Sequence, residues 1–189
     1  RAGRSTEAYN MISCTDYVSW LYPVTMGATS VWERWNGYEA AFGKNNQNSM
    51  NSFNHFALGA VGQWMYEFQL GITTDHASGA AGYKHFVLQP SAGGNYTSLK
   101  GSYTSHYGVI GSSWKADGKG NMTEYHALVP ANTTATLYLP VNNESGSFRS
   151  VKGASFVKIT RRNNLSVAQY ELSSGSFNFV IEQGGITVK

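Results

Sequence analysis

The chain contains 189 residues, of which 41% are hydrophobic, 14% aromatic and only 13% charged, and its formal net charge is +3. This length allows one domain or two small ones, and the composition excludes a disordered segment and a coiled coil. There is no apolar run of about 18 residues that could cross a membrane. The basic residues are too scattered for a nucleic-acid-binding surface, so we expect neither a membrane nor nucleic acid as partner. Because the chain begins at Arg1 without an initiator Met, we expect it to be a mature or truncated part of a longer protein.

The first part of the chain has the residue spacing of helices. One helix is predicted to begin near Ser5 or Thr6, which are good N-cap residues, and to carry Tyr9 and Ile12. Helical residues are expected to continue through residues 16–20. The ring of Pro23 then favours an end to the helix.

A longer helix is predicted over residues 52–70, because apolar residues recur there on one face. The residues of that face are Phe53, Ala57, Ala60, Trp64 and Phe68. The opposite face carries Gly59 and Gly62, and each interior Gly costs about 1 kcal/mol of helix stability relative to Ala. We therefore expect a neighbouring helix to pack closely against these glycines, as in a layered or barrel-like assembly of which two helices are only a part.

The second half of the chain changes to short alternating runs, after a small, polar segment over residues 73–82 that is predicted to be a linker. Residues 117–120 read as a glycine hairpin. Eight or nine short strands at this spacing predict a β-sandwich of Greek-key type. The predicted strands are Tyr83–Leu88, Thr97–Thr104, Val109–Trp114, Thr123–Val129, Thr134–Leu139, Ser147–Val151, Ala154–Ile159, Ser166–Leu172 and Phe177–Ile181.

Five Asn-x-Ser/Thr sequons occur, all of them in this strand-rich half. Their asparagines are Asn95, Asn121, Asn132, Asn143 and Asn164. This distribution fits a secreted, glycosylated protein, although a β region rich in Asn, Ser and Thr also produces sequons by chance. The single cysteine, Cys14, cannot form an internal disulfide and lies in an apolar stretch where we expect it to be inert.

The most unusual stretch is Trp32-Glu33-Arg34-Trp35, in which two large aromatic residues flank an acid and a base. One interpretation is a sugar site, because the apolar faces of sugar rings stack on Trp while their hydroxyls bind charged groups. The alternative is a buried Glu–Arg pair between packed tryptophans. His55 follows an Asn-rich segment that would suit a polyhydroxylated ligand, but a hydrogen-bonded core histidine explains it as well. The other histidines lack metal-ligand spacing, and no phosphate loop or dinucleotide fingerprint occurs, so no cofactor is predicted.

Four segments in order resemble the C-terminal part of the inverting α-L-rhamnosidases. They are residues 27–37, 49–66, 82–90 and 129–136, and the resemblance extends from about Tyr9 to Leu139. Val18 is a departure, since family members commonly carry Pro there. The resemblance implies an α + β chain in which residues 1–79 are the last helices of an (α/α)6, or six-hairpin, barrel. Residues 80–189 would form a C-terminal antiparallel β-sandwich.

The resemblance also implies roles for residues of the unusual stretch. Glu33 would be the catalytic general base that activates water, His55 would contact rhamnose, and Trp32 and Trp35 would wall the pocket. Arg34 would orient its neighbours. The general acid comes from an upstream acidic cluster in this family, and no acidic residue of this chain matches it.

The substrate implied by the resemblance is a rhamnose-containing glycoside or polysaccharide, and the partner is the upstream barrel segment of the same enzyme. Two alternatives stay open from the sequence. One is a non-catalytic carbohydrate-binding or structural β-sandwich module. The other is an (α/α)6 glycosidase that acts on a different sugar.

Overall fold

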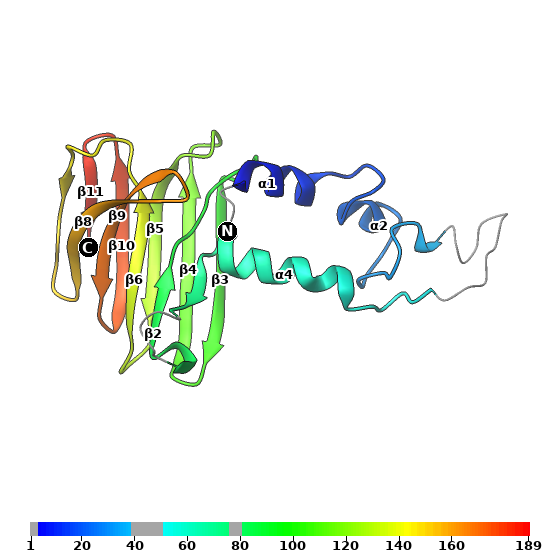
Figure 1. Ribbon diagram of the computed structural model, residues 1–189, viewed down its shortest axis with the longest axis horizontal. Coiled ribbons are helices and arrows are strands. Elements are labelled where there is room, and N and C mark those ends of the chain that lie inside the picture. The colour runs from blue at the N-terminus through cyan, green and yellow to red at the C-terminus, as the bar shows by residue number, and fades with distance from the viewer. Residues whose placement is uncertain (1–3, 39–50, 76–80) are drawn as a thin grey trace. The chain divides into compact units, whose positions relative to one another are not determined.

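The computed structural model describes residues 4–38, 51–75 and 81–189, and these form two compact units (Figure 1). Residues 4–64 form the first, which we call the helical unit, and residues 65–189 form the second, which we call the β unit. Among the described helices, none has the length and apolar character needed to cross a membrane.

The helical unit contains α1 (Ser5–Ser13), α2 (Leu21–Thr25), the 3-10 turn η1 (Ala57–Ala60) and α4 (Val61–Trp64). Helix α1 begins where the sequence predicts, and Tyr9 and Ile12 are buried. The predicted capping is wrong, because Arg4 holds the N-cap position and no side chain caps the helix. Residues 16–20 form bends instead of continuing the helix. Pro23 lies inside α2, in the first turn, where the missing N–H of a proline is tolerated.

The helix predicted over residues 52–70 is only partly correct. Helical geometry begins at Ala57 and passes from η1 through α4 into a π-helical turn, η2 (Met65–Gln69). Residues 52–56 are not helical, because their backbone groups bind the segment around Glu33: the Glu33 N–H donates to Ser52 O and the His55 N–H donates to Val31 O, both over 2.8 Å. The close neighbour expected at the two glycines is not among the described atoms. A Cβ on Gly59 would meet only Val31, at 3.8 Å, and a Cβ on Gly62 would meet no atom within 4 Å.

The β unit is a sandwich of two sheets (Figure 1). Sheet A has the order β1-β2-β6-β9-β8 and sheet B the order β3-β4-β5-β10-β11-β7. The bounds are β1 Ile72–Thr74, β2 His85–Leu88, β3 Ser98–Ser105, β4 Gly108–Ala116, β5 Met122–Val129, β6 Thr134–Pro140, β7 Ser147–Phe148, β8 Ala154–Arg162, β9 Leu165–Leu172, β10 Gly175–Glu182 and β11 Gly185–Val188, with a short 3-10 turn, η3 (Ala81–Tyr83), before β2.

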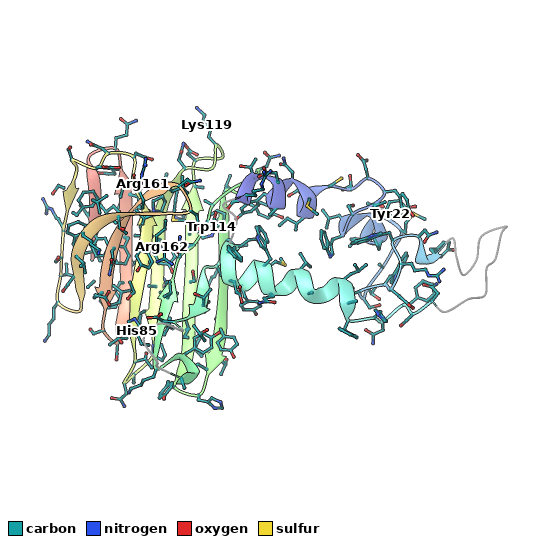
Figure 2. All side chains as sticks on the ribbon, viewed as in Figure 1. Tyr22, His85, Trp114, Lys119, Arg161 and Arg162 are labelled. Atoms are coloured by element: carbon teal, nitrogen blue, oxygen red, sulfur yellow. The ribbon has the colours of Figure 1, made fainter. Side chains whose placement is uncertain are left out.

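All nine predicted strands are present, with two differences from the prediction. Strands β1 and β11 were not predicted, and β7 is shorter than the expected run to Val151. The sheets are mostly antiparallel, but β2 pairs with β6 and β7 pairs with β11 in parallel. The glycine hairpin is confirmed between β4 and β5, and Figure 2 shows Lys119 in this loop. Hydrogen bonds from the Asn121 side chain and the Lys119 N–H lower the pKa of Asp117, the first residue of the loop.

The core forms because inward-facing apolar residues alternate with outward-facing ones along the strands. Strand β5, for example, buries Tyr125, Ala127 and Val129 while the intervening residues are more exposed. An aromatic contact joins the two sheets: the ring of Tyr170 in sheet A packs edge-to-face on that of Phe179 in sheet B, with centroids 5.2 Å apart. The sandwich therefore has one continuous apolar interior.

The segment before β1 is also built into the sandwich. Trp114 Nε1 donates to Gln69 O over 2.8 Å, and Ser112 Oγ donates to Leu70 O over 2.6 Å. Gly71 has a φ of +73°, and a Cβ there would lie 2.1 Å from the carbonyl carbon of Gln89. The linker predicted over residues 73–82 thus begins within β1. Strand β1 lies before the predicted domain boundary at residues 79 and 80, but it pairs with β2 of the sandwich. The exact domain boundary stays a prediction.

Candidate active site in the helical unit

The predicted site residues lie on two segments of the helical unit that are fastened to each other. Besides the two backbone hydrogen bonds described above, the Ser30 hydroxyl donates to Phe53 O, and Asn51 Nδ2 donates to Gly37 O over 2.9 Å. Two chain segments about twenty residues apart are thereby held side by side. This arrangement brings the segment that carries Glu33 next to the segment that carries His55.

The Glu33 carboxylate is held by the backbone of the second segment. Its Oε2 accepts the N–H of Ser52 over 2.7 Å, while the Glu33 N–H donates to Ser52 O. Such a charge-assisted hydrogen bond is short and orients the carboxylate. Glu33 is half-buried, and the structure records no ion pair between it and its neighbour Arg34 within the described chain. The buried Glu–Arg pair considered from the sequence is therefore not what the structure contains.

The two tryptophans beside Glu33 differ in their surroundings. Trp32 is only 6% exposed and packs edge-to-face on Phe53, with ring centroids 5.2 Å apart. Trp35 is half-buried and packs edge-to-face on Trp20, with centroids 5.4 Å apart. Trp32 is thus a packed residue that supports the Glu33 loop, whereas Trp35 keeps part of its indole accessible.

His55 is half-buried, and its ring lies nearly parallel to that of Phe56, with centroids 5.4 Å apart and an interplanar angle of 21°. Phe56 is 88% exposed. Its exposure was not predicted from the sequence, which assigned this residue to a helix. The imidazole and the phenyl ring together present an aromatic surface next to the Glu33 loop.

Sequence reasoning missed the groups that hold the site in place. Ser52 contributes a backbone N–H, which any residue except proline has, so nothing in the sequence marks it. Trp20 supports the site indirectly, since its Nε1 donates to Leu58 O over 2.8 Å while its ring packs on Trp35. The adjacent apolar and aromatic residues of the Trp20 segment are the one signal that could have indicated this packing.

Among the described residues, no group of three or more His, Cys, Asp or Glu side chains is arranged to hold a metal ion. Cys14 is a half-buried free thiol. In the β unit, the asparagines of all five sequons are exposed. The acidic residues that failed to match the family's general acid include Glu39, which lies outside the described residues.

Both parts of the sequence match known families. Residues 1–68 match the bacterial alpha-L-rhamnosidase 6 hairpin glycosidase domain, and residues 71–154 match the bacterial alpha-L-rhamnosidase C-terminal domain. The chain belongs to the α-L-rhamnosidase family. The predicted architecture, the last helices of a six-hairpin barrel followed by a C-terminal β-sandwich, is confirmed by these two matches together with the fold.

Individual members of the rhamnosidase family match most of the chain. An alpha-L-rhamnosidase of Formosa agariphila is 36% identical over 85% of this chain and 17% of its own length. One from Streptomyces avermitilis is 34% identical over 95% of this chain and 16% of its own length. The crystal structure of a Streptomyces avermitilis alpha-L-rhamnosidase complexed with L-rhamnose has a TM-score of 0.70 at 30% identity, covering 92% of this chain and 16% of that one. The chain thus spans about a sixth of the length of these rhamnosidases.

Proposed function

We propose that this chain supplies the general base of a glycoside hydrolase that removes terminal α-L-rhamnosyl residues with inversion of configuration. The observation that carries the proposal is the anchored carboxylate of Glu33, whose Oε2 accepts the Ser52 N–H over 2.7 Å. Membership of the α-L-rhamnosidase family supports the substrate class. The general acid would come from the remainder of the same enzyme.

The chemistry of inversion explains why an anchored carboxylate is useful. An inverting glycosidase has two carboxyl groups about 6.5–9.5 Å apart, of which one protonates the leaving oxygen and the other deprotonates the attacking water. With Oε2 of Glu33 held by the backbone, Oε1 is the oxygen that would take the proton from water. Fixing the carboxylate in one orientation lowers the entropy that is lost when the water, the base and the anomeric carbon come into line.

Neighbouring side chains would bind the sugar. The half-buried indole of Trp35 lies on the same segment as Glu33, and the imidazole of His55 lies on the segment that is hydrogen-bonded to it. We propose that His55 hydrogen-bonds a rhamnose hydroxyl and that Trp35 contacts an apolar face of the ring. Trp32 is almost fully buried, so it would contribute to the pocket by holding the Glu33 loop in place through its packing on Phe53.

The test is Glu33→Gln in the complete enzyme. The amide keeps the size and the hydrogen bond to Ser52 but cannot accept the proton, and loss of a general base lowers turnover by about 10²- to 10⁴-fold. Turnover is measured on an aryl α-L-rhamnoside, and nuclear magnetic resonance of the first product formed reports inversion or retention. Glu7→Gln, at an exposed position of helix α1, is the matched control and should leave turnover unchanged. Wild-type turnover in Glu33→Gln, or a retained configuration, would contradict the proposal.

We also infer that the protein is secreted and carries N-linked glycans. The exposure of all five sequon asparagines supports this, because an acceptor asparagine must be accessible. Expression in a secreting eukaryotic host should give a protein whose mass falls on treatment with an N-glycosidase. A mass equal to that of the unmodified chain would contradict glycosylation.

A further inference from the structure

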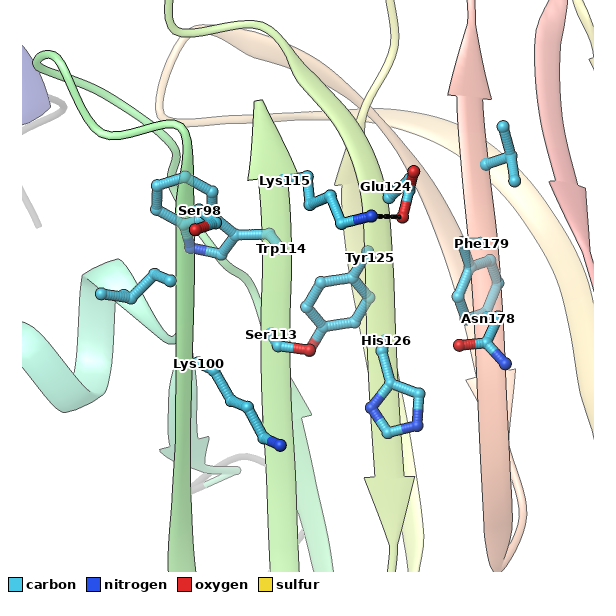
Figure 3. A pocket seen from close by; sticks show the side chains of 12 residues that line it. Ser98, Lys100, Ser113, Trp114, Lys115, Glu124, Tyr125, His126, Asn178 and Phe179 are labelled. Atoms are coloured by element: carbon cyan, nitrogen blue, oxygen red, sulfur yellow. Dashed lines mark ion pairs between the residues drawn. The ribbon is translucent and has the colours of Figure 1, made fainter. Parts of the chain in front are cut away.

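The outward face of sheet B carries a pocket that is unrelated to the Glu33 loop. It has a volume of about 430 Å³ and extends over strands β3, β4, β5 and β10 (Figure 3). Trp114, Tyr125 and Phe179 point into the core, since each is at most 2% exposed. Side chains alternate along a strand. The residues directly before and after each of these three therefore face outward and line the pocket.

The outward residues form a row across the four strands. The register pairs Lys100 with Ser113, Ser113 with His126, and His126 with Asn178. Adjacent strands are about 4.8 Å apart, so the row is about 14 Å long. An ammonium, a hydroxyl, an imidazole and an amide therefore follow each other in a line that is longer than one sugar ring.

The charged side chains that line the pocket do not balance one another. The one carboxylate that lines the pocket, that of Glu124, is bound by Lys115 Nζ at 2.9 Å (Figure 3). Lys100 is exposed, and the structure records no ion pair for it with any described residue. The pocket thus presents one uncompensated positive charge beside neutral hydrogen-bonding groups.

A hydrogen bond within the sheet orients the imidazole of His126 toward a ligand in the pocket. Its Nε2 lies 2.9 Å from the hydroxyl of Ser176 on the neighbouring strand, which fixes the ring and leaves Nδ1 for a ligand. Val180 also lines the pocket, and an apolar side chain beside this polar row suits the mixed polar and apolar surface of sugar rings. The row lacks the several cations that a nucleic acid backbone requires. It suits a ligand that has many hydroxyls and an occasional negative charge.

We propose that this row binds an acidic oligosaccharide, with Lys100 pairing with the carboxylate of a uronic acid residue. Ser113, His126 and Asn178 hydrogen-bond the hydroxyls of the adjoining sugars. The site would hold the enzyme on a carboxylate-bearing polysaccharide whose rhamnosyl residues it removes. That last role rests on the proposed function, but the binding itself does not.

Calorimetric titration of the whole 189-residue chain tests the binding. The probes are hexagalacturonate and, as the uncharged counterpart, galactohexaose. We expect hexagalacturonate to bind at low ionic strength, to weaken as salt is added, and to bind at least tenfold more tightly than galactohexaose. Lys100→Ala should weaken binding about tenfold, and Asn178→Ala should weaken it about threefold.

Lys158→Ala is the matched control, because Lys158 is also an exposed strand lysine but lies on β8 of sheet A. It removes the same charge and should leave the affinity unchanged. Equal losses in the two lysine variants, equal binding of the two oligosaccharides, or no binding of hexagalacturonate would each overturn the proposal. Lys100→Gln is the second variant should Lys100→Ala fail to fold. Since no turnover is measured, these outcomes are independent of the Glu33→Gln experiment.

Discussion

Nε2 of His85 lies 3.0 Å from Oγ1 of Thr136, and this contact joins residues 51 positions apart in the sequence (Figure 2 labels His85). The Thr136 hydroxyl donates to both carboxylate oxygens of Glu171, at 2.9 and 3.0 Å, so its oxygen accepts the Nε2–H of His85. Nδ1 of His85 lies 2.7 Å from Thr134 Oγ1. Side chains thus tie together β2, β6 and β9, and two of the segments that carry the family resemblance meet here as parallel strands.

Thr136→Val should destabilise the β unit by about 1–3 kcal/mol, because the isosteric methyl removes the hydroxyl that Nε2 of His85 and the Glu171 carboxylate both bind. Thr136 is 7% exposed, so water replaces the hydroxyl poorly. Urea unfolding followed by circular dichroism measures the effect. The control is Thr134→Val, whose exposed position lets water reach Nδ1 of His85 and should limit the loss to about 0.5 kcal/mol. Equal losses would mean that the hydroxyl of Thr136 has no special role.

Two buried tyrosines provide a matched pair of substitutions. The Tyr125 hydroxyl lies 3.0 Å from Ser112 Oγ, whereas the Tyr170 hydroxyl is buried without a hydrogen-bond partner among the described residues. Tyr125→Phe should therefore lower the free energy of unfolding by about 1 kcal/mol, while Tyr170→Phe should leave it unchanged or raise it. Both are measured by urea unfolding at neutral pH. A larger loss in Tyr170→Phe than in Tyr125→Phe would contradict this assignment.

The raised pKa values of the same two tyrosines predict that the protein loses stability at alkaline pH. Burial raises the pKa of Tyr170 to about 12 and raises that of Tyr125 further. Above the ordinary tyrosine pKa of about 10, the unfolded chain releases protons that the folded chain keeps, so stability falls by about 1.4 kcal/mol per pH unit for each such group. The stability that the two protonated tyrosines contribute is present in full below pH 10 and is lost as the pH rises toward 12. Unfolding free energies between pH 8 and 11.5 should show this slope, and Tyr170→Phe should make it shallower; an unchanged slope would contradict the prediction.

The strands of the sandwich could be predicted because their alternation is local and regular. Strand β1 could not, since its three residues are held by pairing with β2 and by the bonds that Trp114 and Ser112 make to the preceding residues. The start of the long helix was wrong for the same kind of reason. The apolar spacing from Phe53 onward is compatible with a helix, but the Glu33 loop, about twenty residues away, takes the backbone groups that the first turn would have needed.

The candidate site, too, could be predicted from the sequence only in part. The unusual composition around Glu33 marks it as a place of interest, and the family resemblance assigns the roles of Glu33 and His55. No local pattern indicates that the Ser52 N–H anchors the carboxylate. Nor does any pattern distinguish buried Trp32 from more accessible Trp35, because the aromatic residues that pack on them, Phe53 and Trp20, lie at least 15 positions away in the sequence.

Gly62→Ala tests the prediction that a further helix packs against α4. In the 189-residue chain a Cβ at Gly62 would meet no described atom within 4 Å, so the substitution should stabilise the helical unit by up to about 1 kcal/mol through helix propensity. In the complete enzyme, the added methyl should instead lower the melting temperature, because a closely packed helix leaves no room for it. Gly71→Ala should destabilise both proteins, since its Cβ would collide with the Gln89 backbone, and so establishes the sensitivity of the measurement. If Gly62→Ala stabilises the complete enzyme as much as the chain, the predicted close neighbour does not lie at this glycine.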